Sequence, residues 1–140
     1  MSQVVAPTEL DGGHDAKDIK TMHKFSYGIA SDPLTQLAIV ISALVHDVDH
    51  PGVPNATLVQ EKSALALRYS MRSVAEQNSI DISWSLLLQD SYKELRQAIY
   101  TNQEEYTRFR ALLVNAVMAT DIMDKDLKVL RNQRWSNAFD

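Results

Sequence analysis

Apolar residues recur at helical spacing through most of the chain. Residues 34–45 are almost continuously apolar, which predicts a buried helix. Just before it, Ser31-Asp32-Pro33 supplies a capping side chain and a proline suited to a first helical turn. No later segment alternates apolar and polar residues as a strand does. The pattern therefore predicts an all-α chain.

Five further helices are expected after residue 54. Asn55 is placed to cap a helix that runs to residue 69, and Ser73 to cap a second that runs to residue 88. Residues 92–100 predict a shorter amphipathic helix, and Thr101-Asn102-Gln103-Glu104 is a capping-box pattern that opens a long apolar helix over residues 109–123. A bend at residues 124–126 precedes a last helix with Leu127, Leu130 and Trp135.

The organisation predicted is one multi-helix unit. Residues 1–30 form a weakly patterned lead-in and residues 31–140 are helical, with no repeat or proline-rich linker between them. With 45% hydrophobic and 23% charged residues, the 140-residue chain has the composition of a globular domain. It has no cysteine, which excludes disulfide frameworks and thiolate zinc modules.

Charge and hydropathy limit the partners. A formal net charge of −4 gives no basic footprint, so we expect no nucleic-acid partner. The longest apolar run, residues 37–45, is far shorter than the roughly 20 residues that span a bilayer. The first residues also lack the pattern of a signal peptide. We therefore expect a cytoplasmic segment that makes no membrane contact, although a longer parent protein could be attached to a membrane.

The densest polar cluster, His46-Asp47-Val48-Asp49-His50, directly follows the apolar helix. Burying such groups is costly unless they are paired, hydrated or bound to a cation. In a continuous helix, His46 and His50 would share a face while Asp47 would be rotated by about 100°. We therefore expect the helix to end or distort near Val48, so that His46 and Asp47 share a metal ion with His50 nearby. Imidazole suits zinc and carboxylate suits magnesium or manganese, which favours a two-metal centre.

Two other interpretations of this cluster compete with a two-metal centre. A calcium-binding EF-hand loop beginning at Asp47 would need an oxygen ligand and a glutamate where the chain has Pro51 and Leu58, so it is excluded. A structural role, in which the histidines cap a helix and the aspartates form salt bridges, stays open as the alternative.

Two acidic residues later in the chain are further candidates. Asp121 falls where the pattern predicts burial, and Thr120 beside it can bond backward to the helix. The buried carboxylate either holds a water at the metal or pairs with Arg131 or Arg134. Glu76 falls in the first turn of its helix, where the helix dipole alone explains a carboxylate.

Three blocks in order carry a family resemblance: His46-Asp47-Val48-Asp49-His50-Pro51-Gly52 followed by Asn55, then Ser73-Val74-Ala75-Glu76-Gln77-Asn78, then Ala119-Thr120-Asp121. From residue 34 onward the chain resembles the central part of a class I 3',5'-cyclic nucleotide phosphodiesterase catalytic domain, and its later part is similar to the diatom and related protist members. The resemblance implies an all-α fold and hydrolysis of cyclic AMP or cyclic GMP to the 5' monophosphate.

The resemblance also implies roles. His46 matches a zinc ligand, Asp47 the carboxylate that touches both metal ions, and His50 the histidine that holds solvent at the metal. The remaining matches line the pocket or hold the water shell of the second ion, magnesium or manganese: Asn55, Glu76, Thr120 and Asp121. His50, Glu76 and Asp121 then form the catalytic set, and we expect Asp121 to lie close to the histidines. The implied partners are the cyclic nucleotide and the remainder of the catalytic domain.

The chain also departs from the family pattern. It lacks the preceding His-Asn-x-x-His-Ala block, and it has Glu76-Gln77-Asn78-Ser79 where many members have Glu-Asn-His-His. We therefore expect a fragment of under half a catalytic domain, which folds but is inactive in isolation. The alternatives are another HD-type metal-dependent phosphohydrolase, which would share only His46-Asp47, and a non-catalytic segment that binds a partner.

Overall fold

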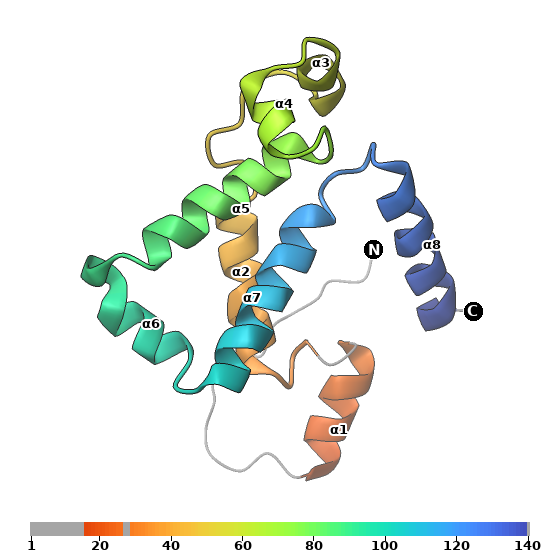
Figure 1. Cartoon of the computed structure of the whole chain (residues 1–140). Coiled ribbons are helices and arrows are strands. Elements are labelled where there is room, and N and C mark those ends of the chain that lie inside the picture. The colour runs from red at the N-terminus through yellow and green to blue at the C-terminus, as the bar shows by residue number, and fades with distance from the viewer. Residues whose placement is uncertain (1–15, 27–28, 140) are drawn as a thin grey trace. The chain divides into compact units, whose positions relative to one another are not determined.

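A computed structural model of the chain describes residues 16–26 and 29–139. The described part contains helices and no strand, which confirms the predicted all-α class (Figure 1). The chain divides into two compact units, Met1–Pro33 and Leu34–Asp140. None of the described helices has the length and apolar character needed to cross a membrane.

The first unit contains a helix that the sequence analysis did not predict. Helix α1 (Ala16–Phe25) lies within the weakly patterned lead-in. Its sequence signal was the recurrence of Ile19, Met22 and Phe25 at intervals of three residues, which is typical of an amphipathic helix. In the last turn of α1, His23 Nδ1 lies 2.8 Å from Ser31 Oγ, which links the helix to the turn that follows it.

The main core of the second unit joins α2 (Pro33–Val45), α5 (Val74–Leu87), α6 (Lys93–Ile99) and α7 (Gln103–Met118) (Figure 1). A short 3₁₀ helix, η1 (Asp90–Tyr92), leads into α6, close to the helix predicted over residues 92–100. The buried residues of this core come from all four helices: Ala38, Ile80, Ile99, Phe109, Leu113 and Val117. Burial of these side chains gives α5 and α7 fixed positions.

A second, smaller core holds α3 (Asn55–Gln60) and α4 (Ala64–Arg68) against the start of α5 through Leu58, Ala66, Tyr69 and Val74. The single helix predicted from Asn55 to residue 69 is therefore wrong. The chain leaves the helical conformation at Lys62, whose φ is 51°, and restarts where Ser63 Oγ accepts the Ala66 N–H. The serine cap favours a new helix start over continuation.

The prediction that α2 is buried is correct only for part of its surface. Ala38 and Ser42 are buried, and Leu34, Ile41 and Val45 pack against the main core. Val40 and Leu44, however, are 65% and 79% exposed. A helix that is apolar on all sides suits burial on all sides, but the described chain covers one face only.

The boundaries of α7 differ from those predicted. Its N-cap is Asn102, whose side chain accepts the Glu105 N–H at 2.9 Å, and Glu105 in turn accepts from the Thr101 N–H and hydroxyl. The predicted capping box of Thr101 and Glu104 is thus shifted by one residue. The helix also ends at Met118 instead of residue 123, so Asp121 lies beyond it.

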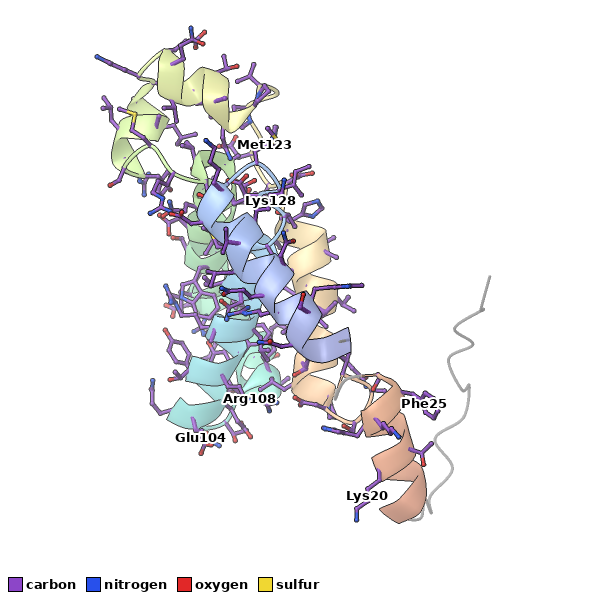
Figure 2. The ribbon with its side chains drawn as sticks, turned by 90° about the vertical axis from the view of Figure 1, so that its right-hand side faces the viewer. Lys20, Phe25, Glu104, Arg108, Met123 and Lys128 are labelled. Atoms are coloured by element: carbon purple, nitrogen blue, oxygen red, sulfur yellow. The ribbon has the colours of Figure 1, made fainter. Side chains whose placement is uncertain are left out.

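Helix α8 (Lys125–Phe139) follows the bend predicted at residues 124–126. Figure 2 shows Met123 and Lys128 on either side of its start. Ion pairs from Arg72 to Asp124 and Asp126 link this start to the segment between α4 and α5. Two of the apolar residues named for this predicted helix are exposed, Leu130 at 48% and Trp135 at 66%.

Candidate metal centre

Helix α2 ends just before the polar cluster, as predicted. The last α-helical bond of this region runs from the His46 N–H to the Ser42 carbonyl. Tighter turns follow, in which the Val48 N–H donates to Val45 and the His50 N–H donates to Asp47. Residues 46–50, which we call the histidine segment, therefore project their side chains from successive turns and not from one helix face.

The contacts of His46 determine which ring nitrogen carries the hydrogen in the neutral form. Nδ1 lies 2.8 Å from the Ala43 carbonyl oxygen, and because a carbonyl only accepts, Nδ1 carries the hydrogen. Nε2 lies 3.1 Å from Asp47 Oδ2. In a neutral ring, Nε2 and the Asp47 oxygen are both acceptors and face each other. A proton or a metal cation on Nε2 stabilises this arrangement.

The His46–Asp47 pair has the spacing of two ligands of one ion. Nitrogen and oxygen ligands about 2.0–2.2 Å from one ion lie roughly 2.8–3.6 Å apart, with the shorter values at octahedral angles and the longer values at tetrahedral angles. The Nε2 to Oδ2 distance of 3.1 Å falls in that range. The Ala43 carbonyl bond also orients the ring, as partners on the far nitrogen do for metal-binding histidines. These two residues therefore fit a divalent metal.

His50 has the opposite arrangement. The Gly52 N–H donates to its Nδ1 at 3.1 Å, so in the neutral ring Nε2 carries the hydrogen. Gly52 has a φ of 75°, which suits glycine and brings its N–H back toward the ring. His46 thus presents a lone pair, whereas His50 presents an N–H donor. The two histidines are suited to different tasks.

A second polar set centres on Asn55. Its Nδ2 donates to Glu76 Oε2 at 2.8 Å and to Asp121 Oδ2 at 3.3 Å, and its Oδ1 accepts the Ala75 N–H at 2.9 Å. We call Asn55, Glu76 and Asp121 the Asn55 network. Reversing the amide would direct its oxygen at two carboxylates and its NH₂ at an N–H donor. The contacts are therefore compatible with one orientation of the Asn55 amide only.

This arrangement corrects the predicted cap of α3. The N-cap of α3 is Pro54, and Asn55 instead satisfies a free N–H in the first turn of α5. Ser73 is the N-cap residue of α5, as predicted, but it has a φ of 38° and its side chain makes no cap bond. Its buried Oγ has no partner within the described part of the chain.

Asp121 is buried, with 6% of its surface exposed, as the sequence predicts. Its Oδ1 accepts the N–H groups of Met123 and Asp124 at 3.0 and 3.1 Å. The backward bond predicted for Thr120 is present, since its Oγ1 donates to the Val117 carbonyl at 2.6 Å. The Thr120 oxygen keeps its lone pairs for another donor.

Two contacts to the histidine segment were not anticipated from the sequence. Asn78 Nδ2 donates to Asp49 Oδ2 at 3.1 Å, and Ser79 Oγ donates to the Val48 carbonyl at 2.7 Å. Asn78 and Ser79 are two of the three positions at which the chain departs from the Glu-Asn-His-His pattern, Gln77 being the third. That departure was the only signal in the sequence.

Six of the seven candidate residues form two polar sets, and Thr120 belongs to neither. In the described part of the chain, no three His, Asp or Glu side chains are close enough to hold one ion. His46 and Asp47 bring a nitrogen and an oxygen within 3.1 Å of each other, and the Asn55 network contains two carboxylates oriented by one amide. We expected Asp121 to lie close to the histidines. In the described residues, Asp121 bonds Asn55 and does not join His46, Asp47 and His50 in one group of metal ligands.

The chain matches known proteins over most of its length. The sequence model of the 3',5'-cyclic nucleotide phosphodiesterase family matches residues 19–134. A mouse dual specificity calcium/calmodulin-dependent 3',5'-cyclic nucleotide phosphodiesterase 1C is 34% identical over 114 residues, covering 78% of this chain and 16% of the relative. The human cGMP-inhibited 3',5'-cyclic phosphodiesterase 3A is 36% identical, over 64% of this chain and 8% of the relative. A probable 3',5'-cyclic-AMP phosphodiesterase of Caenorhabditis elegans is 35% identical, over 69% of this chain and 14% of the relative. The chain thus spans about a sixth or less of these relatives.

Proposed function

Because the chain belongs to the 3',5'-cyclic nucleotide phosphodiesterase family, we propose that the protein carrying it hydrolyses cyclic AMP, cyclic GMP or both to the 5' monophosphate. The observation that supports the role of this segment is the His46–Asp47 pair, whose 3.1 Å separation suits two ligands of one ion. An unrelated HD-type phosphohydrolase is not favoured, because the match extends to residue 134, far beyond the histidine segment.

We propose that His46 Nε2 and Asp47 Oδ2 hold a divalent ion in a centre of two ions, zinc and magnesium or manganese. Bound divalent ions neutralise phosphate charge and lower the barrier to attack on phosphorus. His46 keeps its ring orientation through Ala43, and Asp47, with 67% of its side chain exposed, is free to approach a second ion. Further ligands must come from outside these two residues, since a catalytic zinc site has at least three protein ligands.

His50 is proposed to act through its Nε2–H. Its Nδ1 is occupied by the Gly52 N–H, so the free nitrogen donates a hydrogen bond to solvent or to a phosphate oxygen. That role differs from metal ligation, which needs a lone pair. The tautomer set by Gly52 therefore supports His50 as a residue that orients water, in agreement with the role implied by the family resemblance.

The Asn55 network and Thr120 are proposed to orient water molecules next to the metal centre. Glu76 and Asp121 each give one carboxylate oxygen to Asn55. Glu76 keeps its second oxygen for other donors, and Thr120 keeps its lone pairs. The shared amide holds the two carboxylates in place without neutralising them, which suits groups that accept hydrogen bonds from ordered water.

The rest of the catalytic domain is proposed as the partner that completes the site. The isolated 140-residue chain is therefore expected to fold as helices but to show little turnover, because its described residues bring no three metal-ligating side chains together. A cytoplasmic location of this segment stays a prediction.

The direct test is an assay of the full-length protein with cyclic AMP and cyclic GMP. We expect hydrolysis of at least one, loss of activity after a chelator, and recovery on adding zinc together with magnesium or manganese. Linear 3' and 5' nucleotides serve as control substrates. Failure to hydrolyse either cyclic nucleotide in the metal-loaded protein would contradict the proposal.

A further inference from the structure

The histidine segment is held in place by another helix. Its own bonds are short-range, from His46 to Ala43 and from Gly52 to His50. Two side-chain hydrogen bonds tie residues 48 and 49 to a distant element, and both come from α5, through Asn78 and Ser79. These contacts lie between the metal-binding pair and His50 along the chain.

The two α5 residues are buried and their bonds are well formed. Asn78 is 4% exposed and Ser79 is fully buried. Ser79 donates to a backbone carbonyl at 2.7 Å, and Asn78 donates to a carboxylate oxygen at 3.1 Å. Their neighbour Ile80 belongs to the main core. Because side chains on a packed helix have fixed directions, these bonds transfer the rigidity of α5 to the segment.

The backbone of the segment shows why such support matters. Asp49 has a φ of 57°, in the left-handed region that most residues avoid. Aspartate tolerates this region better than most, yet a strained residue persists only where its surroundings hold it. The Asn78 bond holds the Asp49 side chain, and the Ser79 bond holds the peptide just before it. Together they determine the direction in which the chain leaves Asp47 and reaches His50.

We propose that Asn78 and Ser79 are positioning residues for the metal centre, which set the turn between the His46–Asp47 ligand pair and His50. Neither touches the metal or the substrate. The inference rests on the proposed function in that it takes His46 and Asp47 as metal ligands. It assigns a task to two of the three positions at which the chain departs from the Glu-Asn-His-His pattern, and it makes Asp49 a partner of Asn78 instead of a third ligand.

The first experiment measures Zn²⁺ binding by calorimetry to the metal-free full-length protein. Asn78→Ala and Ser79→Ala should weaken Zn²⁺ binding by about 10-fold, the lower end of the loss seen when the direct partner of a metal ligand is removed, because they act on the ligands through Val48 and Asp49. Ser42→Ala is the matched control, because Ser42 is also buried and also donates to a backbone carbonyl, that of Ala38 within α2. The control should retain wild-type Zn²⁺ affinity. Equal losses in all three variants, or no loss in Asn78→Ala and Ser79→Ala, would overturn the proposal.

A second pair of variants is exposed and does not depend on the stability of the core. Asp49→Asn keeps an oxygen acceptor for Asn78 and tolerates the left-handed conformation, whereas Asp49→Ala keeps neither. Zn²⁺ affinity should stay near wild type in Asp49→Asn and fall in Asp49→Ala. Equal losses would mean that the Asp49 charge, and not its bond to Asn78, matters, and the proposal would fail.

The same proteins separate this inference from the proposed function. If hydrolysis of cyclic AMP and cyclic GMP is absent but the Zn²⁺ affinities change as expected, the positioning role stands and the activity does not. If hydrolysis is present but Asn78→Ala and Ser79→Ala bind Zn²⁺ like the wild type, the activity stands and the positioning role does not.

Discussion

The histidine segment and the Asn55 network use similar side chains in different ways. In the segment, His46 contacts Ala43 and Asp47, its sequence neighbours, and the Asp47 side chain is 67% exposed. In the network, Asn55 contacts Glu76 and Asp121, which are 21 and 66 residues away, and Asp121 is buried. One set is local and open to solvent, whereas the other joins three parts of the fold.

This difference separates chemistry from stability. An exposed carboxylate contributes little to folding, so Asp47 is free to be kept for binding a cation. A half-buried amide with three partners contributes to the packing of α3, α5 and the segment before α8. Mutations in the two sets should therefore have different signatures: those in the histidine segment lower activity at constant stability, and those in the Asn55 network lower stability as well as activity.

The largest expected effect is that of Asp47→Ala in the full-length protein. Loss of a carboxylate that two ions share should lower kcat for cyclic nucleotide hydrolysis by more than about 100-fold. The free energy of unfolding should change by less than about 0.5 kcal/mol, because the side chain is exposed. Asp90→Ala, another exposed aspartate, is the control and should keep full activity. Near-normal turnover in Asp47→Ala would remove the histidine segment from the metal centre.

The next effect is that of Asn55→Ala on stability. It removes a donor from two carboxylates and leaves the Ala75 N–H without its acceptor, so denaturant unfolding should show a loss of about 3 kcal/mol. Asn55→Asp should cost at least as much, because it places a third carboxylate beside Glu76 and Asp121. Asn115→Ala, at an exposed asparagine of α7, is the control. If Asn55→Ala unfolded like the control, the network would not be structural.

The smallest effect concerns a local polar set that stabilises a helix end. Hydrogen bonds from Thr101 and Asn102 lower the pKa of Glu105 below its ordinary value. A lowered pKa means that the charged form stabilises the folded state above the unfolded pKa, and that this contribution is lost as pH falls through the folded value. Glu105→Gln should therefore lower the midpoint of thermal unfolding slightly at pH 7, with a difference that shrinks at pH 3. A difference that did not change with pH would show that charge is not involved.

The local features of the site could be predicted from sequence. The break in α2 before Val48 followed from the conflict between His46, Asp47 and the helical period, and the burial of Asp121 followed from its apolar neighbours. Both depend on residues close together along the chain. The three ordered blocks added the family, which the match over residues 19–134 confirms.

The long-range contacts could not be predicted in the same way. Asn55 looked like the cap of its own helix, but its side chain instead caps α5, because the second core brings α3 and α5 together. Asn78 and Ser79 had no visible role until α5 was placed beside the histidine segment. Hydrogen-bond partners far apart in sequence depend on packing, and a single sequence does not specify packing at that level.

The uncovered face of α2 has a consequence for how the chain behaves in solution. Leu37, Val40 and Leu44 recur at intervals of three and four residues, so they form one apolar stripe that water contacts directly. A stripe of this kind makes protein molecules adhere to one another and to surfaces as their concentration rises. We therefore expect the isolated chain to aggregate at high concentration. Its storage should depend more on dilution and mild detergent than on the free energy of unfolding.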